Sequence, residues 1–200
     1  MRAVEFLKES KSHPVICVDV QPEYANYGRN SIICERIVNF VCNQTGPVLM
    51  FVNAEQDGLT NDSISSIKAY WEETADTYDE DYNSKIDWAR FTIVDKGFGF
   101  FRSYMDQGVQ ESTIIKMIRF LYSTRKQDAR DLTDEEFIQI MGNDDLRDEA
   151  FFINWTSISQ LRNFSGAYIV GGGKNECLRE VQLLMNAFNI RYREVSNLIY

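Results

Sequence analysis

The chain has 200 residues, of which 44% are hydrophobic and 13% aromatic, enough for one domain with a substantial core. Its net charge of −9 at pH 7 argues against nucleic acid and anionic membranes as partners. The first eleven residues are charged and lack the apolar core of a signal peptide, and no apolar run reaches the roughly 18 residues of a membrane span. We therefore expect a cytoplasmic protein that does not associate with a membrane.

The cysteine and histidine content argues against a metal site. The sequence has four cysteines, Cys17, Cys34, Cys42 and Cys177, and a single histidine, His13. No two cysteines form a Cys-x-x-Cys pair. Structural zinc sites need several such ligands at close spacing. We expect no metal and no other cofactor, and free thiols in a reducing compartment.

Apolar segments alternate with helical patterns along the chain. Four strands are predicted at residues 14–19, 47–53, 91–95 and 166–171, all but the third of them buried, with a short last strand near 192–195. Helices are expected at about 31–44, 64–75, 112–126 and 146–164, and Ser31 is the expected cap of the first. A further helix is expected to start at the capping box Thr133–Glu136. Such alternation predicts a single α/β domain, a three-layer α/β/α sandwich with a mainly parallel, Rossmann-like sheet.

The most informative stretch is the end of the fourth predicted strand. Gly171, Gly172 and Gly173 follow an apolar run, and a helical pattern begins near Cys177. Cys177 is therefore expected in the first turn of a helix that leaves the carboxyl end of a strand. Free N–H groups and the helix dipole at such a position can stabilise a thiolate or an oxyanion.

Two further residues of chemical interest are predicted at the same edge of the sheet. Open parallel sheets bind ligands at the carboxyl ends of their strands, where Asp19 and Lys96 also fall. Each residue has a structural alternative: Asp19 as a helix cap, Lys96 as a surface lysine, and Cys177 as a small buried apolar residue. Together, however, they supply a base, a cation and a nucleophile.

These motifs resemble those of the isochorismatase-like cysteine hydrolases, the superfamily that includes nicotinamidases and N-carbamoylsarcosine amidases. The family's Asp-x-Gln pattern is matched by Asp19-Val20-Gln21, and its lysine segment by the residues from Lys96 to Phe101. Its last motif, a glycine with a cysteine six residues later, is matched by Gly171 and Cys177. The resemblance implies hydrolysis of a small amide through a thioester on the cysteine.

The sequence also departs from this family. Lys96 and Cys177 lie farther apart than in most members, so we expect a helical insertion at about 102–145. Its apolar helical faces are predicted to form a lid over the site or a contact in a homo-oligomer. Residues 53–63 lack the histidines that bind metal in nicotinamidases. Gly172-Gly173 stands where the family has a special, often cis, peptide, which two glycines permit without enforcing.

The resemblance assigns roles to individual residues. Asp19 is the expected base, Cys177 the nucleophile, and Lys96 the cation that keeps Asp19 ionised, while the N–H groups of Gly173 and Cys177 form the oxyanion hole. The expected walls of the substrate pocket are Tyr24, Phe98 and Phe100. Two other hypotheses stay open: a catalytically inactive member that serves binding or assembly, and a vinyl-ether hydrolase of the isochorismatase type.

Overall fold

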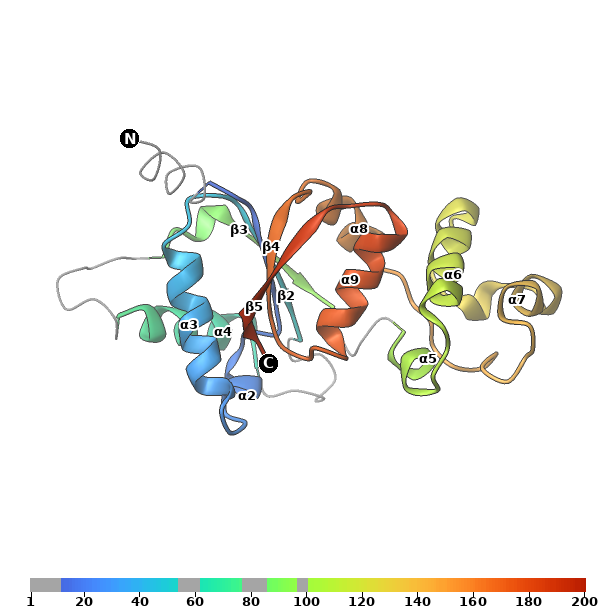
Figure 1. Cartoon of the computed structure of the whole chain (residues 1–200), viewed down its shortest axis with the longest axis horizontal. Coiled ribbons are helices and arrows are strands. Elements are labelled where there is room, and N and C mark those ends of the chain that lie inside the picture. Colours follow the sequence, from blue (N-terminus) through green and yellow to red (C-terminus); the bar gives the residue numbers. More distant parts are fainter. Residues whose placement is uncertain (1–11, 54–61, 77–85, 97–100) are drawn as a thin grey trace.

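The computed structural model describes residues 12–53, 62–76, 86–96 and 101–200, and within them the sheet has five parallel strands (Figure 1). The strands are β1 (Val15–Val18), β2 (Val48–Val52), β3 (Phe91–Asp95), β4 (Ala167–Gly171) and β5 (Tyr192–Ile199), in the order β3-β2-β1-β4-β5. β1 therefore lies at the centre, paired with β2 and β4. The parallel sheet confirms the predicted fold class.

The central strands are apolar throughout because both faces of the sheet are covered. Every residue of β1 and β2 is buried, and successive side chains enter two different cores. Ile16 and Val18 contribute to one core, and Val15 and Cys17 to the other. Burial on both sides explains why these strands lack polar residues at alternate positions.

Helices cover both faces of the sheet and complete three layers (Figure 1). One face packs against α2 (Pro22–Ala25), α3 (Asn30–Cys42) and α4 (Ile64–Asp76). The other side holds α5 (Arg102–Asp106), α6 (Glu111–Thr124), α7 (Asp134–Met141), α8 (Trp155–Arg162) and α9 (Cys177–Ala187). Within the described ranges, no helix combines the length and apolar composition needed to cross a membrane.

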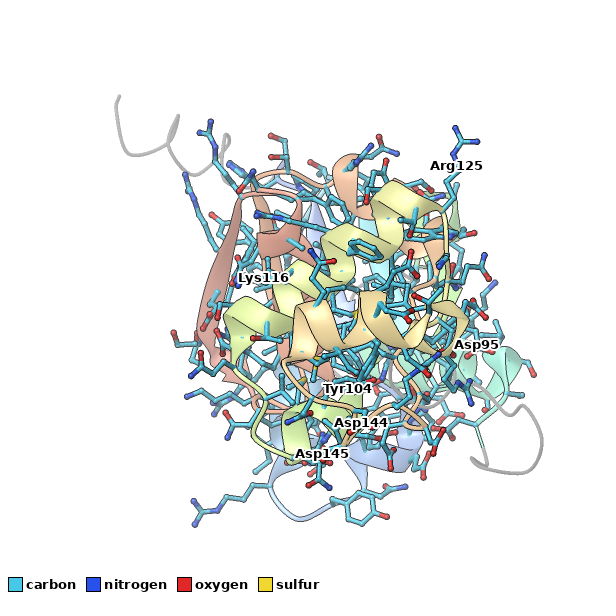
Figure 2. All side chains as sticks on the ribbon, turned by 90° about the vertical axis from the view of Figure 1, so that its right-hand side faces the viewer. Asp95, Tyr104, Lys116, Arg125, Asp144 and Asp145 are labelled. Atoms are coloured by element: carbon cyan, nitrogen blue, oxygen red, sulfur yellow. The ribbon has the colours of Figure 1, made fainter. Side chains whose placement is uncertain are left out.

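The segment predicted as a helical insertion holds α5, α6 and α7. Its apolar residues Ile114, Ile118, Leu121 and Phe137 are buried in the same core as α9, against which α6 packs. The outward side carries exposed charged side chains, among them Lys116, Arg125, Asp144 and Asp145 (Figure 2). These apolar residues are thus covered within the chain, while a contact in a homo-oligomer stays a prediction.

The predicted helix over 146–164 is wrong in its first half. Only α8 is helical, and residues 151–153 are extended, with an antiparallel bridge between Asp128 and Phe152. Phe151 and Ile153 are buried whereas Phe152 is exposed. This alternation is the period of a strand, so the apolar residues fit an extended segment as well as a helix.

Of three element ends predicted from local signals, one is correct and two differ from the structure. The capping box of α7 is confirmed: Thr133 Oγ1 accepts from the Glu136 N–H at 3.2 Å, and Glu136 Oε2 accepts from the Thr133 N–H at 2.8 Å. Ser31 is not the cap of α3, which begins at Asn30 after Arg29. β5 continues to Ile199, beyond the predicted end, because a register shift lets Ile199 pair with Gly171.

Gly171 is expected to tolerate no side chain. Its φ is +120°, and a Cβ atom there would lie 2.0 Å from the Val18 carbonyl oxygen. Gly142 is a matched control, because its φ is +87° but nothing lies within 4 Å of its Cβ position. We expect Gly142→Ala to lower the free energy of unfolding by about 1–2 kcal/mol, and Gly171→Ala by about 3 kcal/mol or more. Urea unfolding that gives equal losses would contradict this packing.

Candidate active site

Asp19 occupies the position directly after β1, where its backbone is strained. The residue has φ of +57°, in the left-handed region that non-glycine residues rarely adopt, and its N–H donates to the Phe51 carbonyl at 2.9 Å. Only 3% of Asp19 is exposed. Strained residues of this kind concentrate at functional sites, which favours a role for Asp19 beyond capping a helix.

Lys96 forms a buried ion pair with Asp19. Its N–H donates to the Val52 carbonyl at 2.9 Å, which places the residue beside the end of β2. The ammonium Nζ lies 3.2 Å from Asp19 Oδ2, and the two side chains are 0% and 4% exposed. Burial lowers the pKa of Lys96, but the nearby Asp19 and Cys177 outweigh burial and raise it. Lys96 is therefore not a surface lysine.

Cys177 is the first residue of α9, and its thiol interacts with both members of the pair. Burial and then the Asp19 carboxylate raise the pKa of the thiol to about 12, although Lys96 opposes them. Cys177 consequently rests as a neutral thiol near pH 7. Burial also raises the pKa of Asp19 above its ordinary value, against the opposing effects of Lys96 and the thiol. All three predicted residues meet at one place.

The turn before α9 contains the backbone N–H groups of Gly173 and Cys177, the two predicted for the oxyanion hole. The N–H groups of Glu176 and Leu178 donate to the Gly173 carbonyl at 2.7 and 3.1 Å. Among backbone hydrogen bonds between described residues, none uses the N–H of Gly173 or Cys177. A Cβ atom on Gly173, where φ is +66°, would lie 2.9 Å from the Cys177 nitrogen. The described residues contain no cis peptide, so the Gly172–Gly173 bond is trans.

A cavity of about 390 Å³ opens beside Asp19 and Cys177. Tyr24 lies in its wall as predicted, with its hydroxyl oxygen accepting from Asn53 Nδ2 at 2.8 Å. The other two residues predicted for the wall, Phe98 and Phe100, lie outside the described residues. A volume of this size suits a small-molecule ligand.

Several charged residues of the cavity wall were not anticipated from the sequence. They are Glu23, Arg102, Asp106, Glu176 and Glu180. Arg102 comes from α5 and binds Asp106 at 2.7 Å and Glu176 at 3.0 Å. Glu180 Oε1 accepts from the Phe101 N–H at 2.7 Å. Its spacing from Cys177, three residues along α9, is the one sequence signal that places it on the same helix face.

Polar contacts join the loops that carry the site. Gln21 Nε2 donates to the Asn53 carbonyl at 2.8 Å, and Gln21 Oε1 accepts from the Asn53 N–H at 2.9 Å. The glutamine of the Asp-x-Gln pattern thus fixes the loop after β1 to the end of β2. On the other side, the Tyr200 hydroxyl donates to the Asp19 carbonyl at 2.7 Å. A Cβ atom on Gly172 would lie 2.1 Å from the Tyr200 ring, so this glycine makes room for it.

In the part of the chain that the structure describes, no three His, Cys, Asp or Glu side chains are grouped so that they could hold a metal ion. No protein-family model, characterised protein or solved structure matches this chain. A functional hypothesis therefore rests on the arrangement of Asp19, Lys96 and Cys177 and on the motifs that surround them.

Proposed function

We propose that this protein is a cysteine hydrolase that cleaves a small amide, as members of the isochorismatase-like superfamily do. The observation that carries the proposal is the buried Asp19–Lys96 ion pair, which interacts with the Cys177 thiol at the start of a helix and beside a cavity. A nucleophile held against a base, with the base oriented by a third group, is the usual arrangement for covalent catalysis.

The raised pKa of Cys177 makes a base necessary. Because the thiol is neutral near pH 7, Asp19 takes its proton as the sulfur attacks the amide carbon. Asp19 then returns this proton to the nitrogen when the C–N bond breaks and ammonia leaves. In the second half, Asp19 takes a proton from water as the water oxygen attacks the thioester. The C–S bond then breaks, and Asp19 returns this proton to the sulfur to restore the thiol.

Lys96 and the turn before α9 complete the mechanism. The Lys96 ammonium favours the ionised carboxylate of Asp19, against the burial that disfavours it. The N–H groups of Gly173 and Cys177 are donors for the oxygen that becomes negatively charged in the tetrahedral intermediate. Without a side chain, Gly173 leaves this space open.

Alkylation of Cys177 by iodoacetamide tests the proposal without a substrate. Since burial is the largest cause of the raised pKa of the thiol and Asp19 takes its proton, Asp19→Asn is expected to slow alkylation of Cys177 at pH 8 severalfold. The same variant should lose amide hydrolysis, because its base and proton donor are gone. Peptide mapping of the folded variant against the wild type gives the rate at each cysteine.

Cys42 is the internal control, since it is also only partly buried. Burial raises the pKa of Cys42 and Arg90 lowers it, whereas Asp19 has no part in the shift. Asp19→Asn should therefore leave the alkylation rate of Cys42 unchanged. If the wild-type protein is alkylated at Cys42 while Cys177 stays unmodified, Cys177 is not an accessible nucleophile. A catalytically inactive, ligand-binding protein would then be the better hypothesis.

A further inference from the structure

The cavity beside Cys177 has more negative than positive side chains. Among the described residues, five carboxylates line it, those of Asp19, Glu23, Asp106, Glu176 and Glu180, against the guanidinium of Arg102 in the wall and the Lys96 ammonium behind Asp19. Arg102 is already bound by two of them, Asp106 and Glu176, at 2.7 and 3.0 Å. The wall therefore offers an incoming ligand an excess of negative charge, and its one guanidinium is committed to the protein.

Glu23 is a carboxylate of the cavity wall that forms no ion pair with a cation of the described residues. Its Oε2 atom is buried, and no hydrogen-bond donor among the described residues reaches it. The Glu23 backbone N–H donates to Asp62 Oδ2 at 2.8 Å, so a second carboxylate lies beside it. Burial, Asp62 and Asp19 all raise the pKa of Glu23, which means that its surroundings disfavour its charge. A bound cation would reverse that effect.

Asp19, on the reacting side of the cavity, also has a carboxylate oxygen without a hydrogen-bond donor among the described residues. Its Oδ2 pairs with Lys96, but the buried Oδ1 accepts no N–H or O–H from the described residues. Buried acceptors in native proteins are nearly always satisfied by protein, water or ligand, so both oxygens are positions to which a bound ligand can donate. A ligand with donors at both ends, an amide and a cationic group, matches the pair.

We infer that the substrate is a small amide that carries a positive charge, and that Glu23 binds its ammonium or guanidinium group. The inference rests on the proposed amide hydrolysis for the reacting bond, whereas the charge preference follows from the cavity wall alone. The net reaction for a primary amide is R–CONH₂ plus water to R–COO⁻ and NH₄⁺, with the cationic group of R unchanged. Anionic amides are rejected because the carboxylates repel them.

Three carboxamides of similar size and different charge test this preference. They are β-alaninamide (cationic), butyramide (neutral) and succinamate (anionic). Binding is measured by calorimetry or ligand-observed NMR at pH 7 and low salt, on Cys177→Ser to prevent turnover. We expect β-alaninamide to bind about tenfold or more tightly than butyramide, since a charge-assisted hydrogen bond contributes that much, and succinamate to bind most weakly.

Glu23→Gln should abolish the preference for β-alaninamide over butyramide. Glu73→Gln is the matched control, because Glu73 is exposed on α4 and does not line the cavity. That control should retain the full preference, which separates a direct contact from the overall charge of the protein. The comparison of the three ligands needs no change at Glu23, so it decides the matter even if Glu23→Gln does not fold.

The outcomes separate this inference from the proposed hydrolysis. Equal affinities for β-alaninamide and butyramide, or no binding of either, overturn the inference, whatever the wild-type protein hydrolyses. A preference for β-alaninamide that vanishes in Glu23→Gln supports it. If that preference is present but the wild-type protein releases no ammonia from β-alaninamide, the cationic site stands and the proposed hydrolysis of this amide fails.

Discussion

Cys177→Ser is expected to lower kcat/KM for ammonia release from β-alaninamide by about a thousandfold or more, the scale of loss when a catalytic nucleophile is replaced. A hydroxyl is much harder to deprotonate than a thiol, and the thiol here already has its pKa raised to about 12. Asp19 therefore cannot generate the oxygen nucleophile at neutral pH. The exchange of sulfur for oxygen is nearly isosteric, so the fold should persist. Coupled detection of ammonia measures the loss.

Cys42→Ser provides the matched control for this result. Cys42 is a partly buried thiol at the end of α3 and does not line the cavity. Its replacement should leave kcat/KM within about twofold of the wild type, as expected for a residue outside the site. Activity of Cys177→Ser comparable to that of Cys42→Ser would exclude a covalent role for Cys177.

The buried ion pair should have the largest effect on stability. Lys96→Met replaces the ammonium by an apolar group of similar length and leaves the Asp19 carboxylate buried without its cation. We expect the free energy of unfolding to fall by about 3–5 kcal/mol at pH 8. Urea unfolding measures this free energy. The double variant Asp19→Asn/Lys96→Met should recover most of the loss, because no buried carboxylate is then left without its cation.

The loss in Lys96→Met should depend on pH in a defined direction. Burial raises the pKa of Asp19 in the folded state above its unfolded value, and removing Lys96 removes an opposing effect. The folded state then binds a proton more readily than the unfolded state, so stability declines as pH rises through the raised pKa. The deficit should therefore be small near pH 4 and increase toward pH 8.

Lys126→Met is the control for a pair that water can reach. Lys126 lies 2.7 Å from Glu136, but the two side chains are 27% and 31% exposed. Loss of this exposed ion pair should lower the free energy of unfolding by less than about 1 kcal/mol. If Lys96→Met lowers stability no more than Lys126→Met does, the Asp19–Lys96 pair does not have the energetic role assigned to it.

The three central residues could be placed from the sequence because of the geometry of parallel sheets. Unbroken apolar runs such as β1 and β2 indicate strands buried on both faces, and their carboxyl ends meet at one edge. Asp19 directly follows β1, Lys96 directly follows β3, and Cys177 starts the helix six residues after the end of β4. No knowledge of how the helices pack was needed to expect that they converge.

The rest of the wall depends on packing between distant segments, which leaves no local signal. Arg102 and Asp106 reach the cavity only because α5 lies against it, and Tyr200 does so because β5 extends beside β4. The excess of carboxylates in the wall could not be predicted from the sequence either, because Glu23 and Glu176 belong to segments far apart in the chain. Local periodicity also misassigned 146–154, where an extended segment buries alternate residues.

An acyl thioester should form on Cys177 during turnover, and mass spectrometry of the acid-quenched protein tests this most directly. Wild-type protein mixed with excess β-alaninamide should gain the mass of one β-alanyl group, located by peptide mapping on the peptide that contains Cys177. Hydroxylamine should remove the added group, as it does from thioesters. Release of ammonia without any acylated Cys177 peptide, or with the group on another residue, would contradict the account.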